Sequence, residues 1–221
     1  MAMSKRLSGF PFRFVAYDPY VQDSLFTADG IRSGDAGKTH YVYNNTIYNI
    51  KNSSGNAASA AGIKVTNGTV TATNNVVLDM DSTGGSEYCF TGTITQSKNI
   101  SSDATGTLTN RTATDDPNPG SGDWVVFTDL TAGSENLHLQ YVAENDALDA
   151  GEDLSSTFKK DIDGETRPTG ANTWDIGADE TGHEPVAQVV AQHPPLPEPV
   201  RQKHPDLRPL RPHQAADHHV G

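Results

Sequence analysis

The chain has 221 residues, of which 34% are hydrophobic, and its formal net charge is −12. This length allows one domain with a sizeable core. The low apolar content, with 20 Gly and 13 Pro residues, argues against a helical bundle and favours a turn-rich β protein. The acidic excess lies in residues 1–180, and it would repel nucleic acid and anionic membranes and attract cations such as calcium. We therefore expect neither nucleic acid nor membrane insertion, since no apolar run reaches the length of a membrane span.

Residues 1–24 are expected to form a lead-in to the fold. The basic opening Met1 to Arg6 is followed by a stretch that Pro11 and Arg13 interrupt, which is not the apolar region of a signal peptide. We therefore expect any export signal to lie upstream of this chain. The single cysteine, Cys89, excludes a disulfide framework and is expected to be a small core residue.

Residues 25–110 contain an internal repeat. Asp29-Gly30-Ile31-Arg32 recurs as Ala61-Gly62-Ile63-Lys64, 32 residues later, and Tyr43-Asn44-Asn45 recurs as Thr73-Asn74-Asn75, 30 residues later. A weaker third copy begins at Tyr88. Each unit reads as three short strands, which in the second unit are residues 62–65, 69–73 and 76–80. One unit cannot bury its own apolar face, so stacked units would supply the core. An antiparallel sandwich is the alternative.

Asn pairs mark the corner between the second and third strand of a unit. Asn adopts the left-handed backbone conformation more readily than other residues with a side chain, which suits a tight corner. Stacked units would place Asn45, Asn75 and Asn99 above one another. Their amides would then be able to form a hydrogen-bonded ladder along the stack.

The later chain has two parts. Residues 111–180 are expected to form a closing segment, with strand-like sequence at 124–127 and 137–139, after a polar surface excursion at 102–122. Residues 181–221 hold 8 of the 13 Pro and 6 of the 8 His residues without apolar periodicity, which predicts a disordered or extended tail.

These patterns together resemble those of right-handed parallel β-helix proteins, the pectate-lyase-like superfamily. The Gly-Ile-basic strands and Asn corners resemble its coils. The ordered motifs of residues 145–151, 161–168 (Asp-Ile-Asp-Gly-Glu-Thr-Arg-Pro) and 175–180 (Asp-Ile-Gly-Ala-Asp-Glu) resemble the closing segment of many secreted bacterial and phage members. Two positions depart from that pattern: Asn145-Asp146 replaces Ser-Pro, and Asp179 replaces an aromatic residue.

The resemblance implies an all-β fold: a right-handed single-stranded parallel β-helix of about three coils, with a C-terminal cap and a disordered tail. It also implies an extracellular location, or one on a cell or virion surface, and contact with polysaccharide. We expect the chain to be a C-terminal section that binds or displays against polysaccharide and is non-catalytic by itself. The alternatives are a polysaccharide lyase or glycoside hydrolase with its active site partly or wholly upstream, and an inert spacer. The oligomeric state stays open.

A lyase would need a basic residue beside the uronate and carboxylates that hold calcium. Arg32 and Lys64 are the candidate catalytic residues because they occupy matching places in adjacent units, with Asp35 and Lys38 nearby. Solvated charges on an exposed strand are the simpler expectation. Asp79 and Asp81 are further cation candidates, with a solvated loop as the alternative.

Asp161, Asp163 and Glu165 are the candidate metal ligands, because oxygen ligands at alternate positions with a Gly at the turn suit a hard cation such as calcium. The rest of a calcium-loop pattern is absent. The alternative is that these carboxylates cap turns and pair with Arg167. No cofactor is required by this reading, and calcium is the one candidate ion.

Tyr41, Tyr43 and Tyr48 are the candidate carbohydrate-binding residues. Some of them must alternate outward from a strand, and exposed rings suit sugar faces. Aromatic stacking within the coil is the alternative. His40 and His138 are lone histidines without a partner at metal-ligand spacing, and the tail histidines offer only loose metal binding.

Overall fold

The computed structural model describes residues 15–16, 28–52, 59–169 and 174–182. They belong to one compact unit, Met1–Gly182, while residues 183–221 form a second unit that lies outside the described residues. The predicted disordered tail, residues 181–221, falls outside them from residue 183 onward, as does most of the lead-in. Its first residue corrects the prediction, because Thr181 is buried and its N–H donates to the Asp175 Oδ2 at 2.8 Å. Within the described ranges the regular secondary structure consists of β-strands alone. No helix there is long and apolar enough to span a membrane.

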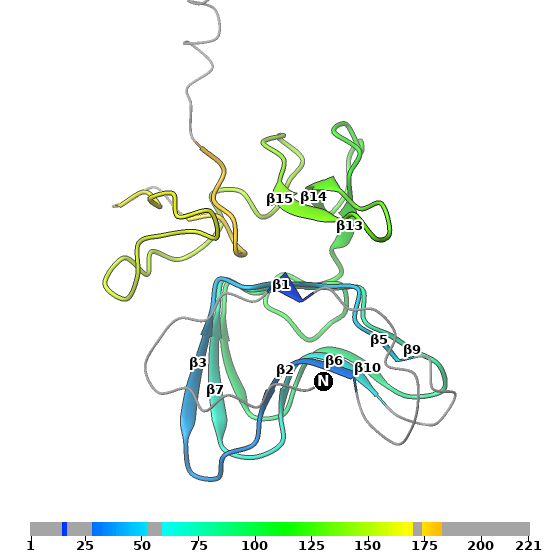
Figure 1. Ribbon diagram of the computed structural model, residues 1–221, viewed down its shortest axis with the longest axis vertical. Coiled ribbons are helices and arrows are strands. Elements are labelled where there is room, and N and C mark those ends of the chain that lie inside the picture. The colour runs from blue at the N-terminus through cyan, green and yellow to red at the C-terminus, as the bar shows by residue number, and fades with distance from the viewer. Residues whose placement is uncertain (1–14, 17–27, 53–58, 170–173, 183–221) are drawn as a thin grey trace, which may run out of the picture. The chain divides into compact units, whose positions relative to one another are not determined.

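Three repeats contribute strands in the same order (Figure 1). The first repeat contains β2 (Ala28–Ser33), β3 (Thr39–Tyr43), β4 (Thr46–Tyr48) and β5 (Lys51–Asn52). The second contains β6 (Ala60–Val65), β7 (Thr69–Thr73), β8 (Val76–Leu78) and β9 (Asp81–Ser82). The third contains β10 (Glu87–Thr91), β11 (Ile94–Ser97) and β12 (Ile100–Ser101), while β1 (Val15–Ala16) precedes the first repeat. The short fourth strands β5 and β9 were not predicted.

Corresponding strands of successive repeats pair in parallel. The sheet orders are β10-β6-β2, β11-β7-β3, β1-β4-β8-β12 and β5-β9. The predicted register is confirmed, because Ile31 lies opposite Ile63 and Arg32 opposite Lys64. An antiparallel sandwich is wrong for these repeats, since every pairing among their strands is parallel.

The main core lies between the three longer parallel sheets. Most of its residues are inward-facing strand residues, since successive side chains of a strand point to opposite faces, while Ile50 and Met80 lie just outside the strands. Its buried members are Val42, Ile47, Ile50, Ala60, Ile63, Val65, Val70, Ala72, Val77, Met80, Cys89 and Phe90. Gly62 is required at its position, because a Cβ atom there would collide with the side chain of Val77 and lie 2.8 Å from the carbonyl oxygen of Cys89.

The Asn corners form the predicted ladder, with one refinement. Asn45, Asn75 and Asn99 are buried and stacked, and the Asn75 Oδ1 accepts from Asn45 while the Asn99 Oδ1 accepts from Asn75, each at 2.9 Å. The left-handed backbone instead belongs to the preceding residue, which is Asn44 (φ 49°) in the first repeat and Asn74 (φ 57°) in the second. The first Asn of each pair makes the corner and the second makes the ladder.

Residues 102–108 lie at the surface and cover the free edge of the third repeat, a role that the predicted surface excursion did not include. The Asp103 Oδ2 accepts from the backbone N–H of Cys89 at 2.8 Å, and the Thr105 Oγ1 accepts from that of Phe90 at 2.9 Å. These oxygens replace the carbonyls that a further strand would supply, which protects the edge strand β10 from pairing with another chain.

The closing segment begins with a small sheet of β13 (Thr112–Thr114), β14 (Trp124–Asp129) and β15 (Asn136–Leu139), in which β13 and β14 are parallel and β14 and β15 antiparallel. A second core joins this segment to the outward side chains of β8 and β12. Its buried members are Val76, Leu78, Ile100, Val125, Phe127, Leu139, Ala147 and Ile176. The segment therefore covers the outer side of a parallel sheet, which corrects the expectation that it caps the end of the stack.

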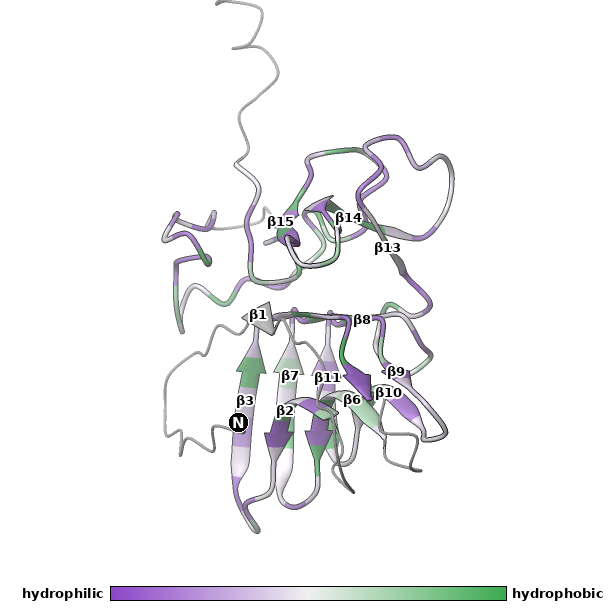
Figure 2. Cartoon of the chain, turned by 45° about the vertical axis from the view of Figure 1, so that its right-hand side comes forward, coloured by the Kyte–Doolittle hydropathy of each residue, from purple (hydrophilic) through white to green (hydrophobic). Residues whose placement is uncertain are grey.

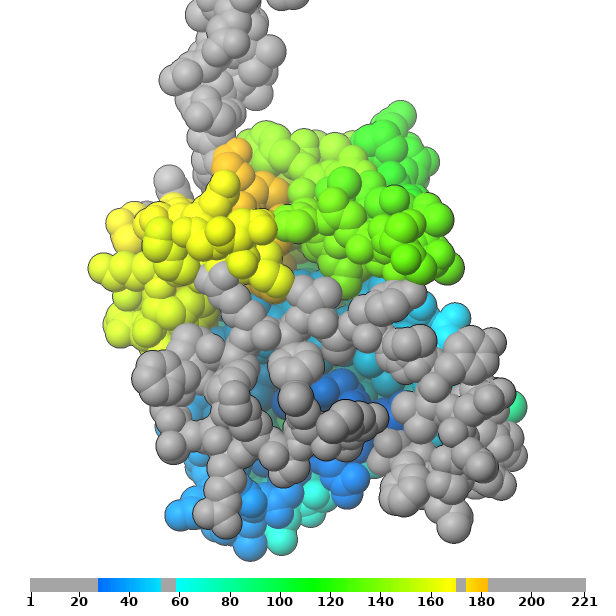
Figure 3. Space-filling view, in the orientation of Figure 1, coloured from blue at the N-terminus to red at the C-terminus, as the bar shows by residue number. Residues whose placement is uncertain are grey.

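Hydrogen bonds fix the last described residues to the first two repeats. The Asn44 amide donates to the carbonyl of Gly177 at 3.1 Å, and the N–H of Gly177 donates to the carbonyl of Asn74 at 2.9 Å. The N–H of Ala178 donates to the Thr46 Oγ1 at 3.0 Å. In the space-filling view these orange residues lie next to the green residues of β15, consistent with the 2.8 Å bond from the Leu139 N–H to the Asp179 Oδ2 (Figure 3).

Candidate functional site

The β3-β7-β11 sheet (Figure 2) carries two neighbouring tyrosines on β3, the exposed Tyr41 and the half-buried Tyr43. Tyr41 is 62% exposed, and its ring centroid lies 5.8 Å from that of Tyr43. Tyr41 lies opposite Thr71 on β7, and Thr71 lies opposite Thr95 on β11. Each repeat therefore adds one outward side chain to a row across three strands, and that row offers one aromatic ring and two hydroxyl groups.

Tyr48 does not join this pair. It lies on β4, and its ring centroid is 6.1 Å from that of Phe127 in the second core. Its hydroxyl is hydrogen-bonded to Asp79, and burial raises the pKa of that hydroxyl. Stacking inside the fold, the alternative expectation for these tyrosines, therefore describes Tyr48, whereas Tyr41 and Tyr43 lie on the open sheet face.

Arg32 and Lys64 project side by side from β2 and β6 and share a carboxylate. The Arg32 Nη1 lies 3.6 Å from the Asp29 Oδ2, and the Lys64 Nζ lies 3.5 Å from the Asp29 Oδ1. The side chain of Asp29 is only 6% exposed. Two cations around one buried anion form a structural ion-pair cluster.

The other lyase candidates are dispersed. The Asp35 Oδ2 lies 3.7 Å from the His40 Nε2, and Lys38 is exposed in the turn that follows. Asp79 has a left-handed backbone (φ 59°), and Asp81 is exposed on β9. Among the described residues these carboxylates do not converge with one another on a common point for a cation.

The loop at residues 161–165 is organised around Asp161. This buried carboxylate accepts through Oδ1 from the N–H groups of Asp163 at 3.1 Å and Glu165 at 2.7 Å. The turn needs Gly164, whose φ of +87° favours glycine. The expected turn capping is thus confirmed for Asp161, while Arg167 pairs with Glu180 at 2.6 Å. As a result, the side chain of Asp163 points away from the loop.

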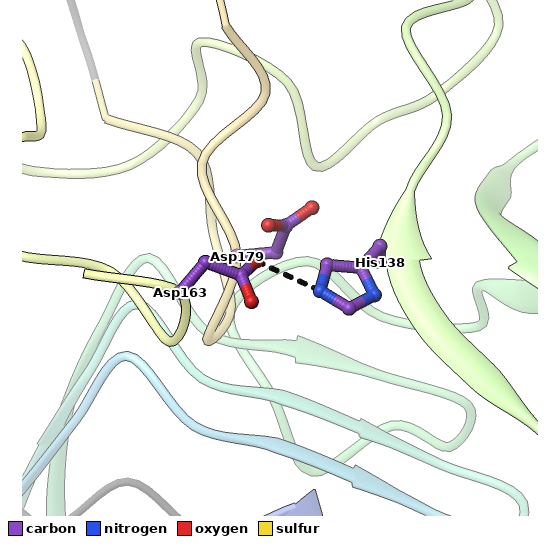
Figure 4. A group of neighbouring side chains, drawn as sticks. All are labelled: His138, Asp163 and Asp179. Atoms are coloured by element: carbon purple, nitrogen blue, oxygen red, sulfur yellow. Dashed lines mark hydrogen bonds and ion pairs between the residues drawn. The ribbon is translucent and has the colours of Figure 1, made fainter. Parts of the chain in front are cut away.

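Asp163 meets His138 from β15 and Asp179 from the last described residues (Figure 4). The His138 Nε2 lies 2.8 Å from the Asp163 Oδ2, and one ligand atom from each of the three residues lies within 4.8 Å of the others. Asp163 was predicted as a ligand, but its neighbours were not. The separations of 25 and 16 residues along the chain give no motif that would have revealed them.

The electrostatics of this group reflect its crowded carboxylates. Burial raises the pKa of Asp179 above its usual range, and the nearby charge of Asp161 acts in the same direction, while the charge of His138 opposes it. The Asp161 Oδ2 is buried and has no hydrogen-bond partner among the described residues. This part of the closing segment therefore concentrates negative charge around one imidazole.

A pocket of about 220 Å³ opens beside the group, and both His138 and Asp179 line it. Glu135 and Asn136 form part of its wall.

Cys89 lies in the main core, where burial raises the pKa of its thiol to about 11, so that it stays protonated at neutral pH.

Comparisons of the chain with protein-family models, with curated proteins and with solved structures found no match.

Proposed function

We propose that the chain is a three-coil section of a right-handed parallel β-helix protein that binds polysaccharide on the outer face of its β3-β7-β11 sheet and does not itself cleave the glycan. The strand order supports the coil, because each repeat returns to the same sheets in the same sequence. Crossover connections between parallel strands of one sheet are right-handed in about 98% of cases, which supports the handedness.

The exposed ring of Tyr41, packed beside the half-buried Tyr43, is the observation that carries the binding function. An exposed aromatic ring offers an apolar plane beside a polar group, and the face of a sugar ring presents C–H groups that pack on such a plane. The neighbouring hydroxyls of Thr71 and Thr95 lie in the same row and can hydrogen-bond to sugar hydroxyls. A flat, repeating surface suits a polymer with a repeating unit.

The charge of the chain favours a neutral polysaccharide over an acidic one. Glu152 lies at the edge of the sheet, where its Oε2 accepts from the Ser97 hydroxyl at 2.8 Å, and its charge acts on Tyr43. The net charge of the whole chain is −12. A polyuronate would therefore be repelled, and its binding would depend strongly on salt.

The ion pairs of Lys64 and Arg32 with Asp29 weigh against the lyase alternative. A general base must be free to reach the proton of the substrate, and both candidates are instead engaged in ion pairs with the carboxylate of Asp29. The polysaccharide partner implies a location outside the cell or on a cell or virion surface.

Affinity electrophoresis tests the binding face. Migration of the chain is followed in native gels that contain a neutral glucan, mannan or xylan, and in parallel gels that contain pectin. We expect at least one neutral polysaccharide to retard the chain, and Tyr41→Ala to weaken that retardation about tenfold, equivalent to the loss of one good stacking contact.

Tyr141→Ala is the matched control, because Tyr141 is 57% exposed but lies outside the sheet. It should be retarded like the unmodified chain. Equal retardation of Tyr41→Ala and the unmodified chain would show that the sheet face does not bind the glycan. Migration that no glycan affects would favour the inert spacer.

A further inference from the structure

We propose that His138, Asp163 and Asp179 form a site for a divalent first-row transition-metal ion such as Zn²⁺. The inference is independent of glycan binding, because the site lies in the closing segment and shares no residue with the sheet face. Its three ligand atoms already lie within 4.8 Å of one another. Three atoms that each contact one tetrahedral ion at about 2.0–2.2 Å lie about 3.3–3.6 Å apart, so binding requires an adjustment of the side chains.

The imidazole of His138 is held in the orientation that a ligand needs. Its Nδ1 contacts the Oδ1 of Asn136, which also accepts from the backbone N–H of His138 at 3.2 Å. Because this oxygen accepts, Nδ1 is placed to donate to it, while Nε2 faces Asp163. Metal-binding histidines almost always donate their second ring N–H to an oxygen in this way, which fixes the ring and its tautomer.

Asp161 supplies an independent observation that points to a cation. It is 1% exposed, and its Oδ2 is buried without a hydrogen-bond partner among the described residues. Its loop is attached beside Asp179, because the Ile162 N–H donates to the carbonyl of Ala178 at 3.0 Å. A buried carboxylate oxygen without a hydrogen-bond partner is costly, and a positive ion between Asp163 and Asp179 would offset the charge of Asp161 as well as theirs.

The ligand chemistry selects a transition metal over calcium. Calcium takes six to eight oxygen ligands, whereas this site offers one nitrogen and two carboxylate oxygens. Imidazole with carboxylate suits Zn²⁺ and its first-row neighbours. Three protein ligands leave a coordination position free, and both His138 and Asp179 line the pocket. Water or a small anionic ligand can therefore reach the ion through this pocket.

Zn²⁺ binding to the full chain tests the site. The six histidines of residues 181–221 are first replaced by alanine, so that tail binding cannot contribute. Competition with a chromophoric chelator should then report one Zn²⁺ per chain, and Zn²⁺ should raise the melting temperature while equimolar Ca²⁺ does not. In this background His138→Gln and Asp163→Asn should each weaken Zn²⁺ binding more than tenfold, and Asn136→Ala about tenfold through the lost ring orientation.

His40→Gln and Asp81→Asn are the matched controls, since neither residue belongs to the group, and both should bind Zn²⁺ like the background chain. Asp163 is exposed, so its variant is expected to keep the β-rich far-UV spectrum and to give a clear result even if His138→Gln is unstable. The proposal is overturned if the background chain binds no Zn²⁺, if Asp163→Asn binds it with unchanged affinity, or if Ca²⁺ binds more tightly than Zn²⁺.

Discussion

Asn75 is the central rung of the buried ladder and serves three repeats at once. Its amide nitrogen donates to the carbonyl of Val42 at 2.8 Å and to the Asn99 Oδ1 at 2.9 Å. Its Oδ1 accepts from the backbone and side-chain nitrogens of Asn45. A buried polar side chain of this kind fixes the register between repeats, because a shift by one residue would leave every rung unpaired.

Asn75→Ala should therefore destabilise the chain by about 3 kcal/mol, because it leaves several buried donors and acceptors unpaired. Urea denaturation followed by far-UV circular dichroism measures this loss. Asn67→Ala, in the exposed turn before β7, should change the free energy of unfolding by less than about 0.5 kcal/mol. A loss for Asn75→Ala as small as that of the control would show that the ladder contributes little.

Single residues were predictable where the repeat aligned them. The positions of Asn45, Asn75 and Asn99 follow from comparing one repeat with the next, as does the pairing of Arg32 with Lys64. His138 lies outside the repeats, so comparing one repeat with another does not predict its position. Its contact with Asp163 depends on how a segment without repeats folds back, and nothing local in the sequence encodes that path.

Arg167 organises the closing segment as an element. Its guanidinium is fully buried, 2.6 Å from the Glu180 carboxylate and 5.1 Å from the centre of the Trp174 ring. It also donates to the carbonyls of Asp175 and Gly177 at 3.2 and 2.9 Å. A planar group with five donors can bind several carbonyls and a carboxylate at once, which lysine cannot. Arg167 thus holds in place the turn that carries Asp179.

Arg167→Met should cost about 3–5 kcal/mol of stability, because it leaves the Glu180 carboxylate buried beside unpaired carbonyls. Chemical denaturation measures the loss, and the double variant Arg167→Met with Glu180→Gln should recover part of it. Lys159→Met, at an exposed position nearby, is the control and should be nearly neutral. If the double variant is no more stable than the single one, the buried ion pair is not the source of the cost.

Elements were predictable to different degrees. The strands of the second repeat follow from alternating β-branched residues and turn signals, and β7 begins and ends where the sequence indicates. Residues 102–108 look like a polar loop because their role is to replace a strand with side-chain oxygens from Asp103 and Thr105. The closing motifs were recognisable, but the sheet side that they cover depends on the outward Val76 and Leu78, whose partners are distant in sequence.

In the whole molecule, the repeats combine a buried core with an outer sheet face to which each repeat adds one strand. The β3-β7-β11 face carries Tyr41 and Tyr43, while the basic residues Arg32 and Lys64 lie on a different sheet and share Asp29. This separation of aromatic and basic residues favours binding without cleavage.

One measurement tests that central claim most directly: incubation of the chain with a panel of neutral and acidic polysaccharides, with and without calcium, followed for bound chain, new reducing ends and unsaturated uronates. The account predicts retention on a neutral polysaccharide with no release of either product. Calcium-dependent release of unsaturated uronate that disappears in Lys64→Ala would contradict it and establish the lyase.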